Sequence, residues 1–343
     1  MSDSSRSRVV LAHAFAGWFT AQHPSWSDIR VTVNRPQPGL SSDTVLLRVA
    51  HEGGDDEFVA RLPPTSDGLF PDYDLVRQQR IQRAVAHAGF PVADALAVEL
   101  DESWVGAPFL LMPKVPGHTL TTAPSYLSEG WLAGATPALQ EQTIRRFIEL
   151  LGTLHRTQFD PDELGELSGG GPDLNGILDY WTRYLDWATD DDEGAAIYRR
   201  ALEWCRARVP ADPPPPSLLW GDPQLVNLVL GNNGEIRAVL DWEMAGYGPG
   251  ELDLAWFLSL HEHAAETAGT TLPGDPGRAA LIAAYGDALG RPVADLEWYE
   301  VLANIRSGLI VLRIGALMER AGHSRSWTAK VPQPRYLATM IGA

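Results

Sequence analysis

Two acids and an amide with the chemistry of a phosphoryl-transfer centre lie close together in this chain: Asp222, Asn227 and Asp241. An amide oxygen and a carboxylate are hard ligands for Mg²⁺, which usually takes only one or two protein groups because substrate phosphates and water complete its octahedron. A second carboxylate beside such a cation can orient an attacking hydroxyl and take up its proton. Phosphoryl transfer needs little beyond positioning, charge neutralisation and one base. The three residues therefore indicate a kinase.

A predicted β-hairpin brings these side chains together. Residues 228–230 and 235–240 are short β-prone runs, and Gly231-Asn-Asn-Gly234 between them is a strong hairpin signal, because Asn and Gly accept the positive φ that such turns need. Asn227 and Asp241 then lie at the open ends of the paired strands, with Asp222 on the same side. Convergence of the three oxygen-bearing groups is the expected result.

Three motifs resemble a known family. Trp220-Gly-Asp-Pro-Gln-Leu-Val-Asn227, Asp241-Trp-Glu243 and Glu251-Leu-Asp-Leu-Ala-Trp256 are similar to the core motifs of the aminoglycoside phosphotransferase-like (APH/choline kinase-like) family. The resemblance implies an α+β, two-lobed, protein-kinase-like fold: a small antiparallel-sheet N-lobe over residues 1–112, a hinge over 113–117, and a mainly helical C-lobe with a catalytic β-hairpin over 118–343.

The same resemblance implies roles for individual residues. Asp222 is expected to be the catalytic base, Asn227 and Asp241 to hold Mg²⁺, and Asp253 to be a buried acid that braces the catalytic loop. The family's commoner His-Gly-Asp is Trp220-Gly-Asp here. Trp cannot copy the hydrogen bonds of His, so we expect Trp220 to pack under the loop of an active enzyme.

Upstream, a Gly/Ser segment between two β-prone runs resembles the family's phosphate-covering loop. The runs are residues 29–34 and 45–49. A Gly-Ser turn between strands is a weak signal by itself, but a third predicted strand over 57–62 strengthens it. The nucleotide-binding residues expected in this loop are Gly39, Ser41, Ser42 and Thr44.

In related kinases, the third strand carries the cation that binds the α- and β-phosphates of the nucleotide. The chain has two lysines, Lys114 and Lys330, and neither lies on this strand. Arg61 does, and its planar fork suits phosphate oxygens. The following helix places Gln78 where many relatives have a pairing Glu, so a weaker Arg61–Gln78 hydrogen bond is expected.

The apolar segment Ala107–Gly117 resembles the hinge that reads adenine in related kinases. Pro113 keeps a carbonyl that can accept from the adenine amino group, and Val115 keeps an N–H to donate. Pro116 has no N–H, so this register alone works.

Helical periodicity is clear in the second half of the chain. Apolar residues recur every three to four positions over 140–156, 177–188 and 296–320. The last run is expected to break at Gly308 or Gly315. Its aromatic residues, and those of 177–188, either line an acceptor pocket or fill core.

Composition limits the partners and the compartment. The formal net charge of −17 argues against nucleic acid, and only weakly favours cationic acceptors. One cysteine, Cys205, excludes an intrachain disulfide and fits a reducing compartment. No apolar segment long enough to cross a bilayer is expected, so the predicted location is cytoplasmic, without a membrane partner.

Three functions remain open from the sequence. The first is a Mg²⁺-dependent enzyme that transfers the γ-phosphate of ATP, or of GTP, to a hydroxyl of a small molecule. The second is a nucleotide-binding pseudokinase, suggested by Trp220 and Gln78. A metal-dependent hydrolase ranks last, because it has no use for Arg61 and no His lies near the acids. Similarity to the kinase-like domains associated with acyl-CoA dehydrogenases implies hydroxyacyl compounds as alternative acceptors to aminoglycosides.

Overall fold

The structure is a computed structural model that describes residues 7–35, 41–64, 67–167, 171, 173–190, 192–293, 296–324 and 331–342. It divides into two compact units. The first comprises Met1–Arg83 and Ala93–Val115, and the second comprises Ala84–Val92 and Pro116–Ala343. The division after Val115 lies inside the segment predicted to be a hinge, whereas a single boundary does not account for Ala84–Val92.

A five-stranded antiparallel sheet forms the first unit, with the strand order β1-β2-β3-β5-β4. Its three upstream strands confirm the β-prone runs of the sequence. The elements of this unit are α1 (Arg8–Gln22), β1 (Arg30–Asn34), β2 (Asp43–His51), β3 (Gly54–Leu62), the start of α2 (Leu75–His87), β4 (Ala97–Glu99) and β5 (Phe109–Pro113).

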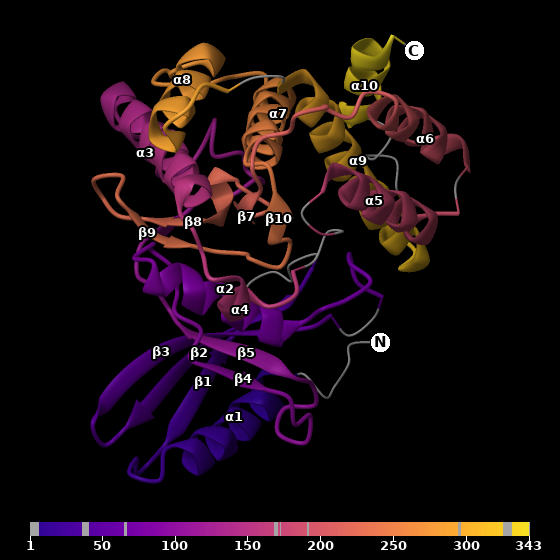
Figure 1. The fold of residues 1–343 in the computed structure, drawn as a ribbon. Helices are drawn as coiled ribbons and strands as arrows, with labels where there is room; N and C mark the ends of the chain where they lie inside the picture. The colour runs from indigo at the N-terminus through magenta and orange to yellow at the C-terminus, as the bar shows by residue number, and fades with distance from the viewer. Residues whose placement is uncertain are drawn as a thin grey trace. The chain divides into compact units, whose positions relative to one another are not determined.

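One face of this sheet packs against α1. Along β2, Val45, Leu47 and Val49 are buried while the residues between them are more exposed, as the period of a strand requires. Phe15 of α1 meets Phe109 of β5 edge-on, with 5.2 Å between ring centroids. Figure 1 shows α1 lying along the sheet. The apolar stripe of α1 therefore closes the core of the first unit.

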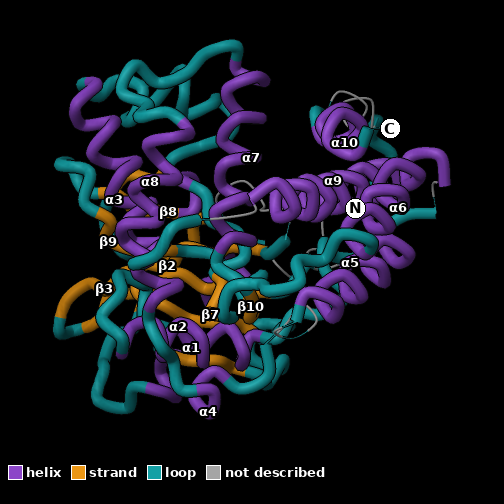
Figure 2. Tube along the Cα trace, turned by 45° about the horizontal axis from the view of Figure 1, so that its top comes forward, coloured by secondary structure: helices purple, strands orange, loops and turns teal. Residues whose placement is uncertain are grey.

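The second unit is mainly helical. Its longest helix, α9, packs against α5, α6, α7 and α10, and Figure 2 shows α5, α6 and α9 side by side. The helices are α3 (Pro137–Arg156), α4 (Pro161–Leu164), α5 (Leu174–Ala188), α6 (Asp192–Arg206), α7 (Glu251–Ala268), α8 (Arg278–Leu289), α9 (Leu296–Arg320) and α10 (Gln333–Ile341).

Helix α9 corrects two expectations. It continues without a break through Gly308 and Gly315. Gly308 instead permits close packing, because a Cβ there would lie 2.3 Å from the ring of Tyr198. By length and composition, with a mean hydropathy of 1.6, α9 also meets the criterion for a membrane span, contrary to the sequence expectation. Since 67% of that window is buried, α9 has the character of a core helix.

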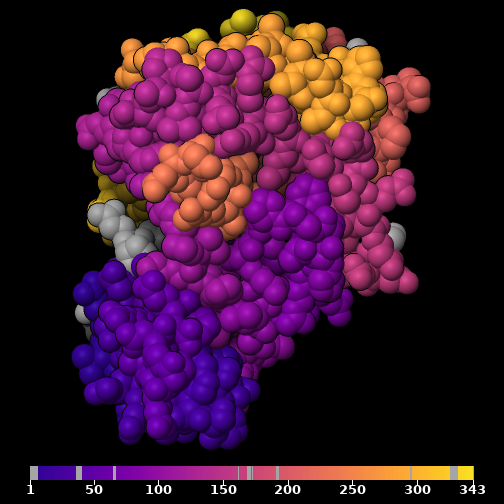
Figure 3. Space-filling model, turned by 90° about the vertical axis from the view of Figure 1, so that its left-hand side faces the viewer, coloured from indigo at the N-terminus to yellow at the C-terminus, as the bar shows by residue number. Residues whose placement is uncertain are grey.

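Two small sheets carry the catalytic motifs. β8 (Leu228–Leu230) and β9 (Ile236–Val239) pair antiparallel, with Leu228 opposite Val239, which confirms the predicted hairpin. In Figure 3 this hairpin, in orange, reaches the surface beside α3, and Arg146 of α3 donates to the Asn233 carbonyl at 2.7 Å. Sequence analysis predicted no strand at β6 (His118–Thr119), at β10 (Gly246–Gly248) or, in the first unit, at β4, and β7 (Ser217–Leu219) is the short strand that leads into the loop of Asp222.

Candidate active site

The loop that carries Asp222 leaves β7 and turns sharply at Gly221. Gly221 has φ of +90°, a conformation that side chains with a Cβ rarely adopt. A Cβ at this position would also lie 2.0 Å from the carbonyl oxygen of Met244. Both the backbone angle and the available space therefore require glycine directly before Asp222.

Three side chains hold the Asp222 carboxylate in one orientation. Gln224 Nε2 and Trp256 Nε1 donate to Oδ1 at 2.6 and 2.8 Å. Asn227 Nδ2 donates to Oδ2 at 2.8 Å. Because three donors from two elements converge on one carboxylate, its rotamer is fixed before any substrate arrives.

The electrostatic surroundings of Asp222 make it a stronger proton acceptor. Burial raises the pKa of the Asp222 carboxyl above its ordinary value, and the nearby charge of Asp241 raises it further. Hydrogen bonds from Gln224, Asn227 and Trp256 lower the pKa but do not reverse the shift. A raised carboxyl pKa is the usual way in which proteins prepare a carboxylate for general-base work.

Asn227 and Asp241 lie at neighbouring ends of the hairpin. The Asn227 carbonyl accepts the Leu240 N–H at 2.9 Å, so Asp241 follows the last backbone bond of the ladder. Asp241 has φ of +61°, a conformation uncommon for a residue with a side chain. Asn227 uses Nδ2 for Asp222, so Oδ1 is the atom of its amide that could bind a cation. One amide oxygen and one carboxylate fit Mg²⁺.

No group of three or more His, Cys, Asp or Glu residues among the described parts of the chain could hold a metal ion. A cation at Asn227 and Asp241 would therefore complete its coordination with water and phosphate oxygens, as Mg²⁺ does in phosphoryl-transfer sites. This donor set does not suit a structural zinc site, which needs four protein ligands.

Asp253 holds the backbone of the loop just before Asp222. Its fully buried carboxylate accepts the backbone N–H groups of Trp220 at 2.7 Å and Gly221 at 3.1 Å. His155 Nε2 lies 3.1 Å from the same carboxylate, and His155 Nδ1 lies 2.7 Å from the Tyr285 hydroxyl. Burial raises the pKa of Tyr285 well above its ordinary value. Because an ionised carboxylate only accepts hydrogen bonds, the contact with Asp253 requires a proton on His155 Nε2.

The sequence had suggested that Trp220 packs under the loop, and in the structure it also forms hydrogen bonds. The side chain is fully buried, and its indole N–H donates to the carbonyls of Leu240 at 2.9 Å and Asp241 at 3.0 Å. The indole thereby ties the loop that carries Asp222 to the backbone of Asp241. Sequence analysis missed these hydrogen bonds because it considered only whether Trp could form the hydrogen bonds of a His at this position.

Replacing Trp220 with Phe is expected to destabilise the protein by about 1–2 kcal/mol, since buried carbonyls lose their donor, and to raise the Mg²⁺ concentration needed for half-maximal activity. Urea unfolding and Mg²⁺ titration measure the two effects. Trp242→Phe is a matched control, because the buried Trp242 indole donates to the Val239 carbonyl at 3.2 Å and not to Asp241. The same Mg²⁺ requirement in both variants would contradict the assignment.

In the first unit, three of the predicted phosphate-binding residues lie together. Thr44 and Arg61 are cross-strand partners in β2 and β3. Arg61 Nη2 donates to Ser42 Oγ at 3.1 Å. Ser41 lies next to Ser42 in the same segment, and Gly39 lies outside the described residues. A guanidinium beside hydroxyl groups is a suitable set of donors for phosphate oxygens.

The expected hydrogen bond between Arg61 and Gln78 is not formed. Gln78 is buried on α2, and its Oε1 atom has no hydrogen-bond partner in the described part of the chain. Because Oε1 is the acceptor that an arginine would need, Gln78 does not hold Arg61 here. Its role towards a nucleotide stays a prediction.

Pro113 and Val115 lie on either side of Lys114, whose backbone N–H has a known partner. The Lys114 N–H donates to the Glu57 carbonyl at 2.9 Å, which points Lys114 towards β3. In an extended chain, the N–H and C=O of one residue point to the same edge, and those of the neighbouring residues point to the opposite edge. The Pro113 carbonyl and the Val115 N–H are therefore expected to face away from β3, and their contact with adenine stays a prediction.

Several contributors were not singled out from the sequence. Gln224 and Trp256 stood inside the recognised motifs, so their position was available but not their contact with Asp222. Arg306 donates from Nη2 to the Gly221 carbonyl at 3.0 Å. Its only sequence signal is a cation within an apolar helix. Arg35 and Asp43, which form an ion pair at 2.7 Å beside the Gly/Ser loop, had no signal.

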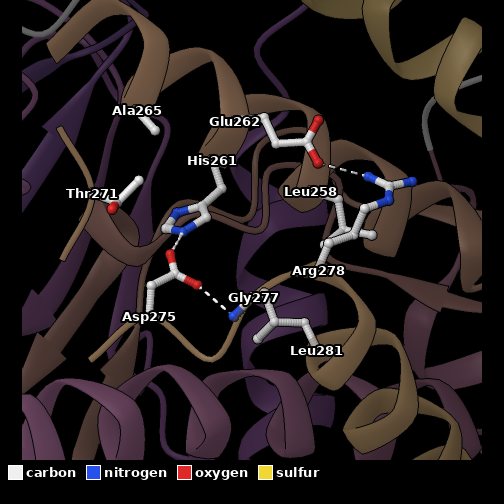
Figure 4. Close-up of a pocket in the computed structure, with 9 residues that line it drawn as sticks. All are labelled: Leu258, His261, Glu262, Ala265, Thr271, Asp275, Gly277, Arg278 and Leu281. Atoms are coloured by element: carbon white, nitrogen blue, oxygen red, sulfur yellow. Dashed lines mark hydrogen bonds and ion pairs between the residues drawn. The ribbon is translucent and has the colours of Figure 1, made fainter. Parts of the chain in front are cut away.

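A separate pocket of about 310 Å³ lies between α7 and the start of α8. Figure 4 shows His261 directed at Asp275 and Glu262 directed at Arg278. His261 Nε2 lies 2.6 Å from Asp275, and Arg278 pairs with Glu262 at 2.9 Å. The charged groups of this pocket are thus engaged with each other, and its His261–Asp275 pair has no described hydrogen bond to the Asp222 loop.

Comparison with curated proteins gives distant relatives. The chain is 27% identical over 219 residues to mouse acyl-CoA dehydrogenase family member 10, an alignment that covers 64% of this chain and 19% of the relative. It is 25% identical over 228 residues to human acyl-CoA dehydrogenase family member 11, covering 66% of this chain and 28% of the relative. The chain therefore spans less than a third of the length of these relatives.

Comparison with solved structures shows the fold. A putative aminoglycoside phosphotransferase from Ralstonia eutropha superimposes with a TM-score of 0.70 at 22% identity, covering 96% of this chain and 95% of that one. The protein-kinase-like α+β fold expected from the motifs is thereby confirmed. A model of the phosphotransferase enzyme family (APH) matches residues 32–301. The chain, with its Asp222 loop, Asn227–Asp241 hairpin and bracing Asp253, belongs to that family.

Proposed function

We propose that this protein is a Mg²⁺-dependent kinase that transfers the γ-phosphate of ATP, or of GTP, to a hydroxyl group of a small molecule. The arrangement of Asp222 carries the proposal. Its carboxylate is held by three side-chain donors, has a raised pKa, and lies beside Asn227 and Asp241. A base and two oxygen ligands in one loop system are the parts that phosphoryl transfer uses.

Each residue has one task in this proposal. Asp222 orients the acceptor hydroxyl and takes its proton. Asn227 and Asp241 would hold Mg²⁺, which neutralises phosphate charge when bound. Arg61, with Ser42, would donate to the nucleotide phosphates. Thr44, Ser41, Gly39, Gln78, Pro113 and Val115 are proposed to complete nucleotide binding in the first unit.

A pseudokinase is the less favoured alternative. The two departures that suggest it are Trp220 and Gln78. Trp220 strengthens the connection between the loop and the hairpin instead of weakening it, which favours an active enzyme. The amide oxygen of Gln78 has no hydrogen-bond partner among the described residues, which favours looser binding of the nucleotide phosphates but does not remove the base.

The acceptor is proposed to be a hydroxylated small molecule, with two classes in contention. The acidic net charge of −17 favours cationic amino sugars. The names of the relatives, acyl-CoA dehydrogenase family members 10 and 11, favour hydroxyacyl compounds. We further propose a cytoplasmic location without nucleic-acid or membrane partners.

A labelled transfer assay tests this function. Purified protein is incubated with Mg²⁺ and γ-labelled ATP or GTP against amino sugars, amino alcohols and hydroxyacyl compounds, and phosphate monoesters are identified by ³¹P NMR. Acceptor-dependent label that disappears with EDTA is the expected result. Nucleotide binding without transfer to any acceptor would favour the pseudokinase, and release of free phosphate without an acceptor would favour a hydrolase.

A further inference from the structure

Arg306 is a buried cation that forms no ion pair with a carboxylate among the described residues. Its side chain lies within α9 in the second unit and is 5% exposed. No carboxylate of the described residues forms an ion pair with it, and its Nε atom has no hydrogen-bond partner. Burying a charge without a direct ion pair is costly, and an apolar side chain of similar size would fill the same space more favourably. Packing alone therefore does not account for an arginine here.

The first contact of Arg306 is with the backbone of the catalytic loop. Nη2 donates to the Gly221 carbonyl at 3.0 Å. That carbonyl belongs to the peptide group joining Gly221 to Asp222, and the peptide group is planar. A hydrogen bond that fixes the carbonyl oxygen therefore also fixes the N and Cα atoms of Asp222, from which its side chain extends.

The second contact is with the indole that holds the Asp222 carboxylate. The guanidinium carbon lies 4.7 Å from the centroid of the Trp256 ring and 5.4 Å from that of Trp181. Both distances are within the range of cation–π attraction. Trp256 in turn donates from Nε1 to Asp222 Oδ1 at 2.8 Å. One side chain thus contacts both the backbone before Asp222 and a donor to its carboxylate.

The charge of Arg306 also interacts with the acids of the candidate active site. Burial lowers the pKa of the guanidinium, while the charges of Asp253 and Asp222 oppose that shift. Both acids therefore lie near enough to interact with it electrostatically.

We infer that Arg306 is a positioning residue for phosphoryl transfer: its guanidinium fixes the Gly221 carbonyl and the Trp256 indole, and through them the orientation of the Asp222 carboxylate. This inference rests on the proposed function of Asp222 as the base. It assigns to α9, far away in sequence, a direct part in setting the geometry of the reaction.

Arg313 offers a matched control on the same helix. It is also buried, at 3% exposed, and its guanidinium carbon lies 4.0 Å from the centroid of the Trp187 ring. Neither Arg313 nor Trp187 has a described hydrogen bond to the Asp222 loop. Replacing Arg313 removes a similar buried cation from a similar aromatic contact, but not from the catalytic loop.

The test compares Arg306→Met with Arg313→Met. The first is expected to lower kcat about 10²-fold, the scale for a misplaced reacting group, with the nucleotide Kd and acceptor KM within about threefold of wild type. The second is expected to keep kcat within about threefold. Wild-type kcat in Arg306→Met, or an equal loss in both variants, would overturn the inference.

Two further measurements cover variants that fold poorly or an enzyme whose acceptor is not found. Millimolar guanidinium ion is expected to restore activity to Arg306→Ala in a saturable manner, but not to Asp222→Asn. In ¹⁵N-indole NMR spectra, with the Trp256 signal assigned through Trp256→Phe, the Trp256 N–H resonance is expected to shift in Arg306→Lys and in Asp222→Asn but not in Arg313→Lys.

The NMR result separates the two proposals. If the wild-type protein transfers phosphate to no acceptor, the proposed function fails, and the indole resonance alone decides the role of Arg306. An unchanged Trp256 resonance in Arg306→Lys and Arg306→Met, or the absence of guanidinium rescue in an otherwise active enzyme, refutes the positioning role.

Discussion

Asp222→Asn should reduce kcat for phosphoryl transfer by about 10² or more, the usual contribution of a general base. The amide has nearly the shape of the carboxylate but cannot take up the proton of the acceptor hydroxyl. One of its two positions also becomes an NH₂ group, which faces a donor from Gln224 and Trp256 or from Asn227. The initial rate of phosphate transfer at saturating nucleotide and acceptor measures the effect.

Nucleotide binding and folding distinguish this loss from general damage. The Kd for nucleotide is expected to stay within a few-fold of wild type, because Arg61 and Ser42 are unchanged. The unfolding temperature is expected to change little, since the substitution removes one of the two charges, Asp222 and Asp241, that oppose each other. Equal rates in the two proteins would remove the role assigned to Asp222.

Asp253→Asn is the second substitution with a large expected effect, on stability as well as on rate. The buried carboxylate accepts two backbone N–H groups, from Trp220 and Gly221, and faces His155 Nε2. The asparagine side chain would have one acceptor oxygen in place of two. Its NH₂ group would face one of the donors that Asp253 binds, and that donor would lose its partner. The expected loss of unfolding free energy is about 3 kcal/mol, and kcat should fall because the loop before Asp222 loses its support.

Asp275→Asn provides the comparison, because Asp275 also pairs with a histidine, His261, at 2.6 Å in the same unit. Its other described bond is to the Gly277 N–H and not to the catalytic loop. Chemical unfolding should show a loss of stability in both variants, whereas kcat should fall in Asp253→Asn alone. A similar kcat for the two would show that bracing by Asp253 is not needed for transfer.

The parts of the site that could be predicted from sequence are those set by local chemistry. The turn at Gly231–Gly234 has the residues that a tight hairpin requires, so the antiparallel pairing of residues 228–230 with residues 235–240 was predicted from it. Asn227 and Asp222 lie within one loop, and their contact at 2.8 Å needed no distant element. The resemblance of Glu251–Trp256 to a family motif likewise implied that Asp253 braces the loop.

Other features depended on neighbours that sequence spacing does not specify. Gly308 was expected to interrupt α9, but it accommodates Tyr198 of α6 and the helix continues. Gln78 was expected to form a hydrogen bond with Arg61, but its acceptor atom is buried and has no partner in the part of the chain that the structure describes. In both cases the outcome depends on which side chain lies opposite, and that is decided by the packing of separate helices and strands.

The sequence by itself determined the chemical groups, the hairpin and the family, because each rests on residue types at short spacing, where backbone conformation is governed locally. Only the tertiary structure decided that Trp220 donates to the backbone of Asp241 and that Arg306 on α9 contacts Gly221 and Trp256. The first contact joins the loop to the hairpin, whereas the contacts of Arg306 join segments far apart in the chain, and their geometry follows from how α7 and α9 pack.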